Sequence, residues 1–272
     1  MSRLEVVSAG TLTTVQDRGR VGWAHLGVPR AGALDAPAAA LANRLVGNPP
    51  DAAVLETVLG GLALRNAGPG RWAALTGAST APTFWWAAGG ELRVPVPTYG
   101  LRSYVAVAGG IDVDPVLGSR STDTLAWVGP PRVVDGTSLP LGEPTGAPRP
   151  LDVPPARREG ALRVLPGPRA DWFASLAPLF GSEWVVRPDS DRIGLRLDGP
   201  ALERVGAGEL PSEGMVLGAV QVPPSGRPIV FLADHPPTGG YPVVGVVHPD
   251  DLWRCAQVRP GERVRFRGVS TR

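Results

Sequence analysis

Two similar stretches of sequence decide the fold class. They are VPVPTYG at residues 94–100 followed by SYVAVA at 103–108, and VQVPPSG at 220–226 followed by IVFLA at 229–233. In each, a run rich in β-branched residues enters a turn that contains proline and glycine, and a second apolar run leaves it. This pattern is typical of strand, turn and strand. Its recurrence predicts a mainly β chain that contains an approximately duplicated unit.

A proline-rich stretch separates the two halves of the chain. Residues 139–158 contain six prolines and little periodic apolar pattern, as extended linkers do. We therefore expect domains at residues 1–140 and 159–272, joined by a linker at 141–158. The halves begin alike, with short apolar strands expected at 4–7 and 162–165.

Signals for helices are few. Asp35 is a predicted N-cap, Pro37 suits a first helical turn, and a helix is expected over 38–46 with Gly47 ending it. A second helix is expected over 169–176, ended by Pro178. Alternating apolar runs predict strands at 102–108, 184–187 and 263–267. Two closed or nearly closed β-barrels, each with a helix or two, fit these elements best.

Composition excludes several kinds of function. All 27 basic residues are arginine, so a P-loop lysine, a pyridoxal Schiff base and a lysine general base are absent from this sequence. The formal net charge is only +2 and the arginines are dispersed, which argues against a nucleic-acid-binding face. The sequence contains no apolar signal core and no run long enough to span a membrane, so we expect a soluble, cytoplasmic protein.

Isolated cysteine, histidine and tryptophan residues carry little functional signal. The single cysteine, Cys255, is expected to be a buried structural thiol. His25, His235 and His248 lack metal-ligand spacing, so no zinc site is expected. Trp85 and Trp86 suit either a partner interface or the core, and the core is the commoner place for such a pair.

Two polar motifs in the first half are candidate binding segments. In TTVQDRGR at 13–20, the amide of Gln16, the acid Asp17 and the guanidinium of Arg18 stand between turn glycines. Arginine binds carboxylates and phosphates through two parallel hydrogen bonds, but an internal Asp-Arg pair that fixes a turn explains the motif equally well. GVPRAGALD at 27–35 contains Arg30 and leads into the predicted helix, where backbone amides favour anions; Asp35 is more simply a cap.

Two further polar motifs complete the candidate set. GSRSTD at 118–123 surrounds Arg120 with hydroxyls, including Ser121 and Thr122, and this mixture suits an oxyanion. It lacks the spacing of a serine-hydrolase nucleophile elbow. ADHPPTGGYP at 233–242 places an acid, a histidine, a hydroxyl and a phenol beside paired glycines at a strand end, with the amide of Gln221 upstream. Its candidate residues are Asp234, His235, Thr238, Gly239, Gly240 and Tyr241; a proline-stiffened loop is the structural alternative.

Together these motifs resemble the biotin-dependent carboxyltransferase-like family, also called allophanate hydrolase subunit 2. The resemblance rests on TTVQDRGR, GVPRAGALD, LET at 55–57, GSRST, SDRIGLRL at 190–197, SEGMVLGAVQVPPSGRPIV at 212–230 and DHPPTGGYP, in this order from about residue 4 to 266. The resemblance implies a pair of cyclophilin-like β-barrels. It is strongest to the C subunit of 5-oxoprolinase, which implies two partners: the A subunit of the oxoprolinase, together with a smaller, carboxyltransferase-like B subunit.

The resemblance also implies a reaction. ATP, with magnesium in the complex, activates the lactam of 5-oxoproline for hydrolysis to glutamate. We expect Arg18, Arg120 and Arg192 to bind the substrate carboxylate or a phosphorylated intermediate, and Asp234, His235 and Asp17 to take part in catalysis. Many relatives have DRQTTGGYP where this chain has DHPPTGGYP, so roles that depend on the missing arginine and glutamine do not transfer.

Two other functions remain open from the sequence. One is a carboxyltransferase acting on urea or a related amide; without lysine the chain cannot hold biotin covalently, so biotin would arrive on another chain. The other is a regulator that binds a histidine-kinase inhibitor protein. The complete set of polar motifs favours catalysis.

Overall fold

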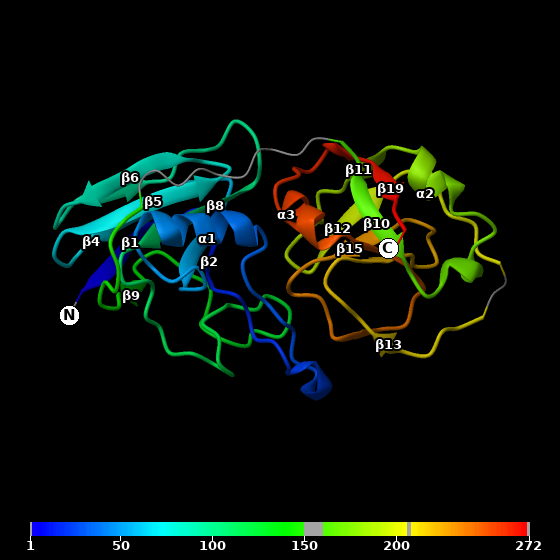
Figure 1. Ribbon diagram of the computed structural model, residues 1–272, viewed down its shortest axis with the longest axis horizontal. Helices are drawn as coiled ribbons and strands as arrows, with labels where there is room; N and C mark the ends of the chain where they lie inside the picture. Colours follow the sequence, from blue (N-terminus) through cyan, green and yellow to red (C-terminus); the bar gives the residue numbers. More distant parts are fainter. Residues whose placement is uncertain (1, 150–159, 206–207, 271–272) are drawn as a thin grey trace. The chain divides into compact units, whose positions relative to one another are not determined.

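The computed structural model describes residues 2–149, 160–205 and 208–270, in two compact units (Figure 1). Unit 1 comprises the described residues of Met1–Val21, Ala31–Asp123 and Trp127–Ala156. Unit 2 comprises those of Gly22–Arg30, Thr124–Ala126 and Arg157–Arg272. The chain therefore contributes two short segments of its first half to unit 2.

Unit 1 contains two antiparallel sheets. The four-stranded sheet has the order β7-β4-β1-β9 and the five-stranded sheet the order β2-β3-β8-β5-β6. The strands are β1 (Arg3–Ala9), β2 (Leu12–Gln16), β3 (Val54–Val58), β4 (Leu62–Asn66), β5 (Arg71–Gly77), β6 (Ala81–Trp86), β7 (Glu91–Arg93), β8 (Arg102–Val107) and β9 (Ser138–Pro140).

Side chains alternate between the two faces of the five-stranded sheet, and its central strand is buried on both of them. Val105 and Val107 of β8 face a core that the two sheets share, with Leu4 and Leu64 from the other sheet. Tyr104 and Ala106 face the opposite way, toward helix α1 (Ala36–Leu45). All of β8 is therefore buried, as expected for a central strand covered on both sides.

Helix α1 begins as the sequence predicts. Asp35 is its N-cap, and the carboxylate accepts a hydrogen bond from the backbone N of Ala38 at 3.0 Å. Pro37 lies in the first turn, where its missing N–H costs no helical hydrogen bond. The cap reading of Asp35 is confirmed.

Unit 2 is built on one eight-stranded sheet of order β18-β11-β12-β15-β14-β17-β10-β19. Its strands are β10 (Leu162–Pro166), β11 (Trp184–Val186), β12 (Gly194–Asp198), β14 (Ala219–Gln221), β15 (Ile229–Phe231), β17 (Val243–Val247), β18 (Arg263–Val264) and β19 (Phe266–Gly268). The edge strands β18 and β19 are separated in sequence by Arg265 alone. The Cα atoms of Val264 and Phe266 can lie at most about 7 Å apart, so the two edges must approach each other and the sheet forms a nearly closed barrel.

Short elements complete the structure: η1 (Ala24–Leu26), η2 (Ala170–Trp172), α2 (Ala177–Gly181), η3 (Pro249–Asp251), α3 (Leu252–Cys255) and the two-stranded pair β13 (Glu213–Gly214) with β16 (Thr238–Gly239). None of the helices in the described part of the chain is long and apolar enough to cross a membrane.

The prediction of a mainly β chain is confirmed, whereas the predicted helix over 169–176 is wrong. That stretch contains only the single turn η2, and helix α2 begins near Pro178 instead of ending there. Proline is well suited to a first helical turn, and the sequence prediction used it as a stop. The echo of strand, turn and strand holds for β14 and β15, which pair. In the first half it is wrong: residues 94–97 form no strand, and the preceding strand β7 lies in a different sheet from β8.

Two further expectations can be compared with the structure. Cys255 is buried, and burial raises the pKa of its thiol to about 12, which confirms an unreactive structural residue. Trp86 is 4% exposed, whereas Trp85 is 57% exposed, so only Trp86 belongs to the core.

The predicted linker at 141–158 falls partly outside the described residues, which omit 150–159. Before that gap, Leu141 is buried in the core of unit 1 and the backbone N of Arg149 donates to Leu45 O at 3.1 Å. The domain boundaries expected from the sequence stay a prediction.

Barrel closure in unit 2 can be tested at Phe266, which is 2% exposed on the edge strand β19. We expect Phe266→Ala to lower the free energy of unfolding by about 3–5 kcal/mol, since a buried ring is lost and a cavity remains. Phe180→Ala is the matched control, because Phe180 is 37% exposed. Urea denaturation of both variants measures the difference, and equal losses would contradict the assignment.

Candidate functional site

In unit 1, the carboxylate of Asp17 is the centre of a hydrogen-bond cluster. The hydroxyls of Ser119 and Ser121 each donate to Oδ1 at 2.6 Å, and the backbone N of Gly19 donates to it at 2.7 Å. The backbone N of Arg120 donates to Oδ2 at 2.6 Å. These four donors occupy both oxygens of the carboxylate, and they fix the 119–121 turn to the end of β2.

The amide of Gln16 is equally occupied. It is fully buried, and Nε2 donates to Thr14 Oγ1 at 3.0 Å and to Thr122 O at 2.9 Å. Its Oε1 accepts from the backbone N of Gly32 at 3.2 Å. Gln16 therefore joins three chain segments, and Thr122 is one of them through its backbone.

The two arginines of these motifs differ in their exposure to solvent. Arg120 donates through Nη2 to Asp112 Oδ1 and through Nε to Val113 O, each at 2.7 Å. Arg18 is 71% exposed, and its guanidinium lies 3.4 Å from the carboxylate of Asp51, which is itself half exposed. Such a surface pair is weak, so Arg18 is the more available cation.

A buried polar cluster beside α1 escaped the sequence analysis. The hydroxyl of Tyr104 donates to Glu56 Oε2 at 2.8 Å and accepts from the backbone N of Asp35 at 2.7 Å. The same Glu56 oxygen accepts from the backbone N of Leu34 at 3.0 Å, while Arg102 lies 3.5 Å from Oε1. Burial raises the pKa of Tyr104 well above its usual value, and the charges of Glu56 and Asp35 act in the same direction. The signal in the sequence was an acid inside the apolar strand VLETV.

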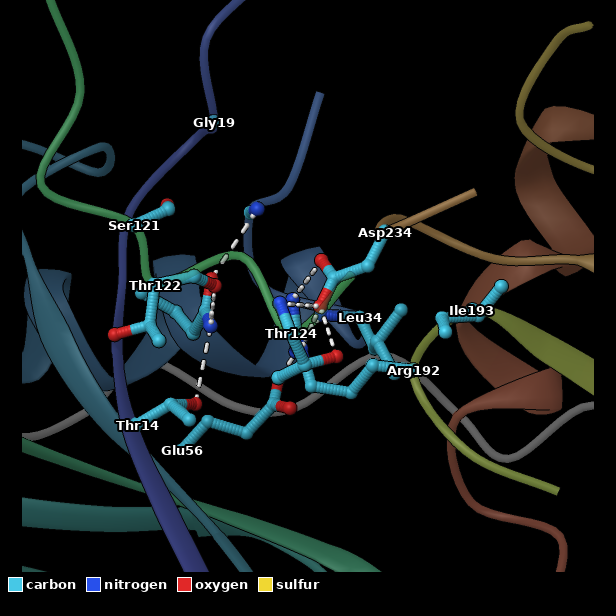
Figure 2. Close-up of polar contacts among 12 residues, drawn as sticks. Thr14, Gly19, Leu34, Glu56, Ser121, Thr122, Thr124, Arg192, Ile193 and Asp234 are labelled. Atoms are coloured by element: carbon cyan, nitrogen blue, oxygen red, sulfur yellow. Dashed lines mark hydrogen bonds and ion pairs between the residues drawn. The ribbon is translucent and has the colours of Figure 1, made fainter. Parts of the chain in front are cut away.

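In unit 2, Asp234 and Arg192 form a fully buried ion pair (Figure 2). Arg192 Nε donates to Oδ2 and Nη2 to Oδ1, both at 2.9 Å, which is the two-pronged geometry that guanidinium favours. Thr124 adds two donors to Oδ2, its backbone N at 2.9 Å and its hydroxyl at 2.7 Å. The charge of Asp234 is thus neutralised and its oxygens are occupied.

His235, the next residue, is placed differently. Its Nδ1 lies 2.8 Å from the carbonyl oxygen of Pro236, and because a carbonyl only accepts, Nδ1 carries the proton. The ring is 6% exposed. Burial lowers its pKa below the usual 6.5 and the charge of Arg30 adds to this, while the Pro236 contact and Asp234 oppose it. His235 is therefore a neutral imidazole at neutral pH, with Nε2 as a hydrogen-bond acceptor.

Gln221 contacts the loop that contains Gly239 and Gly240, and the β13–β16 pair holds this loop in place. Gln221 Nε2 donates to Tyr241 O at 3.1 Å and lies 3.9 Å from the sulfur of Met215. A Cβ on Gly239 would approach Gln221 Nε2 to 2.8 Å, so a larger residue there would displace the Gln221 amide. Segment 213–215 is held against this loop by the pairing of Gly214 with Thr238.

The remaining predicted residues of unit 2 lie at its surface. Thr238 and Tyr241 are exposed, and Gly240 is partly exposed. Arg30 is also exposed, and it is the cation that acts on His235.

The comparison with protein families gives one decisive result. The model described as "Carboxyltransferase domain, subdomain A and B" matches residues 26–268. The chain belongs to this carboxyltransferase family. The resemblance seen in the sequence is therefore confirmed.

Individual relatives agree with this membership. The chain is 40% identical to the 5-oxoprolinase C subunit of Escherichia coli, over 97% of this chain and 90% of that protein. It is 34% identical to urea amidolyase of Lachancea kluyveri, over 98% of this chain but only 17% of that protein. The crystal structure of TTHA0988 matches with a TM-score of 0.87 and 39% identity, covering 98% of this chain and 55% of that one, so the chain spans little more than half of that solved relative.

Each unit of this carboxyltransferase-family chain contains a polar cluster. Unit 1 brings together Gln16, Asp17, Arg120, Ser121 and Thr122, and unit 2 brings together Arg192, Gln221, Asp234, His235, Thr238, Gly239, Gly240 and Tyr241. Within residues 2–149, 160–205 and 208–270, no group of three or more acids, histidines or cysteines is arranged to hold a metal ion.

The buried pair of unit 2 gives a stability prediction. Asp234→Asn leaves the Arg192 charge buried without its counter-charge, and we expect a loss of about 3–5 kcal/mol in the free energy of unfolding. Asp189→Asn is the matched control, since the Arg187–Asp189 pair is about half exposed and we expect its loss to have a much smaller effect. An Asp234→Asn chain of wild-type stability that is inactive in an assembled enzyme would instead support a catalytic role.

His235 gives a pH prediction. The folded protein disfavours its imidazolium, so stability is full above the unfolded pKa of about 6.5 and falls as the pH drops from there to the lower folded pKa. NMR titration of the ring should show the lowered pKa, and His235→Phe should remove this part of the pH dependence of unfolding. A folded-state pKa above 6.5 would contradict the described environment.

Proposed function

We propose that this chain is the carboxyltransferase-like subunit of an ATP-dependent 5-oxoprolinase, which hydrolyses 5-oxo-L-proline to L-glutamate. The observation that carries the proposal is the 40% identity to the Escherichia coli C subunit, extending over 97% of this chain and 90% of that protein. A second relative of the same name, from Haemophilus influenzae, is 31% identical over 98% of this chain.

The proposed reaction breaks the C–N bond of a five-membered lactam. Water adds to the ring carbonyl carbon, the nitrogen leaves as the amine of glutamate, and hydrolysis of ATP to ADP and phosphate drives the step. Amide resonance stabilises the lactam, so coupling to phosphoryl transfer is chemically reasonable.

ATP and its magnesium are not expected to be held by this chain. There is no lysine, and buried arginines of the described residues are already occupied: Arg192 by Asp234, and Arg71 by the carbonyl oxygens of Ala108 and Gly142. These contacts do not suit a triphosphate. We therefore place the nucleotide site on a partner subunit.

The geometry changes the roles proposed for individual residues. Arg192 is buried against Asp234, and Arg120 donates to Asp112 at 2.7 Å. The exposed Arg30 and Arg18 are better placed to receive an anionic group of a substrate or intermediate, since the Arg18 contact with Asp51 is a weak surface pair. Asp234 and Asp17 act as positioning residues, since their oxygens are filled by internal donors. His235 is the candidate for proton transfer.

The partners in this proposal are an A subunit together with a smaller B subunit. The name of the Escherichia coli relative identifies it as one subunit of several. A cytoplasmic location stays a prediction from the sequence.

A second candidate is a carboxyltransferase that acts on urea or a related amide. The 34% identity to urea amidolyase favours it, although the chain corresponds to only 17% of that protein. Biotin would then be carried by another chain, because this one has no lysine to which it can be attached.

Reconstitution tests the proposal. We expect the chain, co-expressed with the A and B subunits, to support ATP-dependent release of glutamate from 5-oxoproline, and omission of this chain to abolish it. Asp189→Asn in the complex is a control that should leave the rate unchanged. A stable complex without turnover would overturn the proposal, and biotin-dependent carboxylation of urea by such a complex would favour the second candidate.

A further inference from the structure

Two side-chain acceptor atoms of unit 2 are not used by internal hydrogen bonds of the described residues, although both residues are almost completely buried. They are Nε2 of His235, 6% exposed as a residue, and Oε1 of Gln221, 3% exposed. Each side chain uses its other polar atom internally, on Pro236 O and Tyr241 O respectively. Neither acceptor has a hydrogen-bond partner among the described residues. Neither is among the fully buried side-chain atoms that lack a partner, so each keeps some exposed surface.

Both side chains rest on the same small apolar cluster. It consists of Met215, Ala219, Phe231 and Val243. The rings of His235 and Phe231 are 6.1 Å apart between centroids, and the Gln221 amide lies 3.9 Å from the Met215 sulfur. The backbone N of Met215 donates to Pro237 O at 2.8 Å, which joins the cluster to the loop that carries His235.

Internal hydrogen bonds determine which polar atoms of His235 and Gln221 remain available to a ligand. The Pro236 carbonyl holds the proton of His235 on Nδ1, and the Tyr241 carbonyl accepts from the Gln221 amide nitrogen and so leaves the amide oxygen unused. Both free atoms are therefore acceptors. Arg192, which would otherwise add a donor, is bound to Asp234.

We propose that His235 Nε2 and Gln221 Oε1 form a recognition site for the N–H groups of a neutral amide, such as the N–H of a lactam or the NH₂ of an open amide. This inference rests on the proposed function only for the identity of the substrate, because the two acceptors alone select ligands that carry N–H groups. His235 is thus a specificity-determining residue: an ester or lactone offers no donor and leaves the acceptors unpaired.

The test compares two ring compounds of nearly equal shape. The probes are 2-pyrrolidinone, which has a lactam N–H, and γ-butyrolactone, which has a ring oxygen there. Their affinities are measured by NMR titration of the full chain, alone and with its partner subunits. We expect the lactam to bind at least about fivefold more tightly, the equivalent of one neutral hydrogen bond.

Two variants separate recognition from structure. His235→Phe keeps an aromatic ring beside Phe231 but removes the acceptor, so the lactam-to-lactone preference should fall to about one. His235→Gln keeps an acceptor near the position of Nε2 and should retain most of the preference. A purely structural His235 would change both affinities by the same factor and leave the ratio intact.

The pH dependence supplies a second readout. Protonation converts Nε2 into a donor, so in the wild type the preference for the lactam should weaken as the pH falls below 6.5 and through the lowered pKa of His235, and it should stay unchanged in His235→Gln. The charged groups that act on His235 are Arg30 and Asp234; Asp234 is locked to Arg192 and arginine does not titrate in this range.

The outcomes also separate this inference from the proposed function. A His235-dependent lactam preference in a complex that does not hydrolyse 5-oxoproline would support the site and reject the function. Hydrolysis with equal binding of both probes, or with the same preference in His235→Phe, would overturn the site and leave the function standing. Absence of any lactam binding would also overturn the site.

Discussion

The carboxylate of Asp234 is shut off from water, and this constraint organises unit 2. A buried charge is tolerated only when a counter-charge and hydrogen-bond donors surround it. Arg192 and Thr124 supply both, and Thr124 belongs to a segment that the chain contributes to unit 2 from its first half. His235 follows directly in sequence, so the pair also sets where the imidazole lies.

In unit 1 the acid Asp17 is only partly buried, and neutral donors hold its carboxylate. Asp17 is held by two serine hydroxyls and two backbone amides, without an arginine side chain. In each unit, the hydrogen bonds to one acid hold one loop in place. Conspicuous acids in such loops are therefore internal ligands of the fold, and the groups left for external chemistry are their less conspicuous neighbours.

The internal role of these acids explains which features could be predicted from the sequence and which could not. Alternating apolar residues predicted the β strands, Asp35 and Pro37 predicted helix α1, and motif order predicted the family. The sequence could not show which acid would pair with which arginine, because Arg192 and Asp234 are brought together by folding and not by proximity in the chain. The same holds for Glu56 and Tyr104, which meet only because β3 and β8 are neighbours. Pro178 was misread because one residue can either end a helix or begin one.

The single residue between β18 and β19 has a consequence for how the protein is made. Strand β10, the first of unit 2's barrel, pairs in parallel with β19, the last, so Leu162 lies opposite Phe266 near the end of the chain. Pairing of such distant segments is slow, because a long loop must close before contacts repay its entropy. During synthesis this barrel cannot close until its last strand has left the ribosome, whereas the strands of unit 1 are complete much earlier. Unit 2 therefore passes through a stage in which β10 is an open sheet edge, exposed to partners or to aggregation.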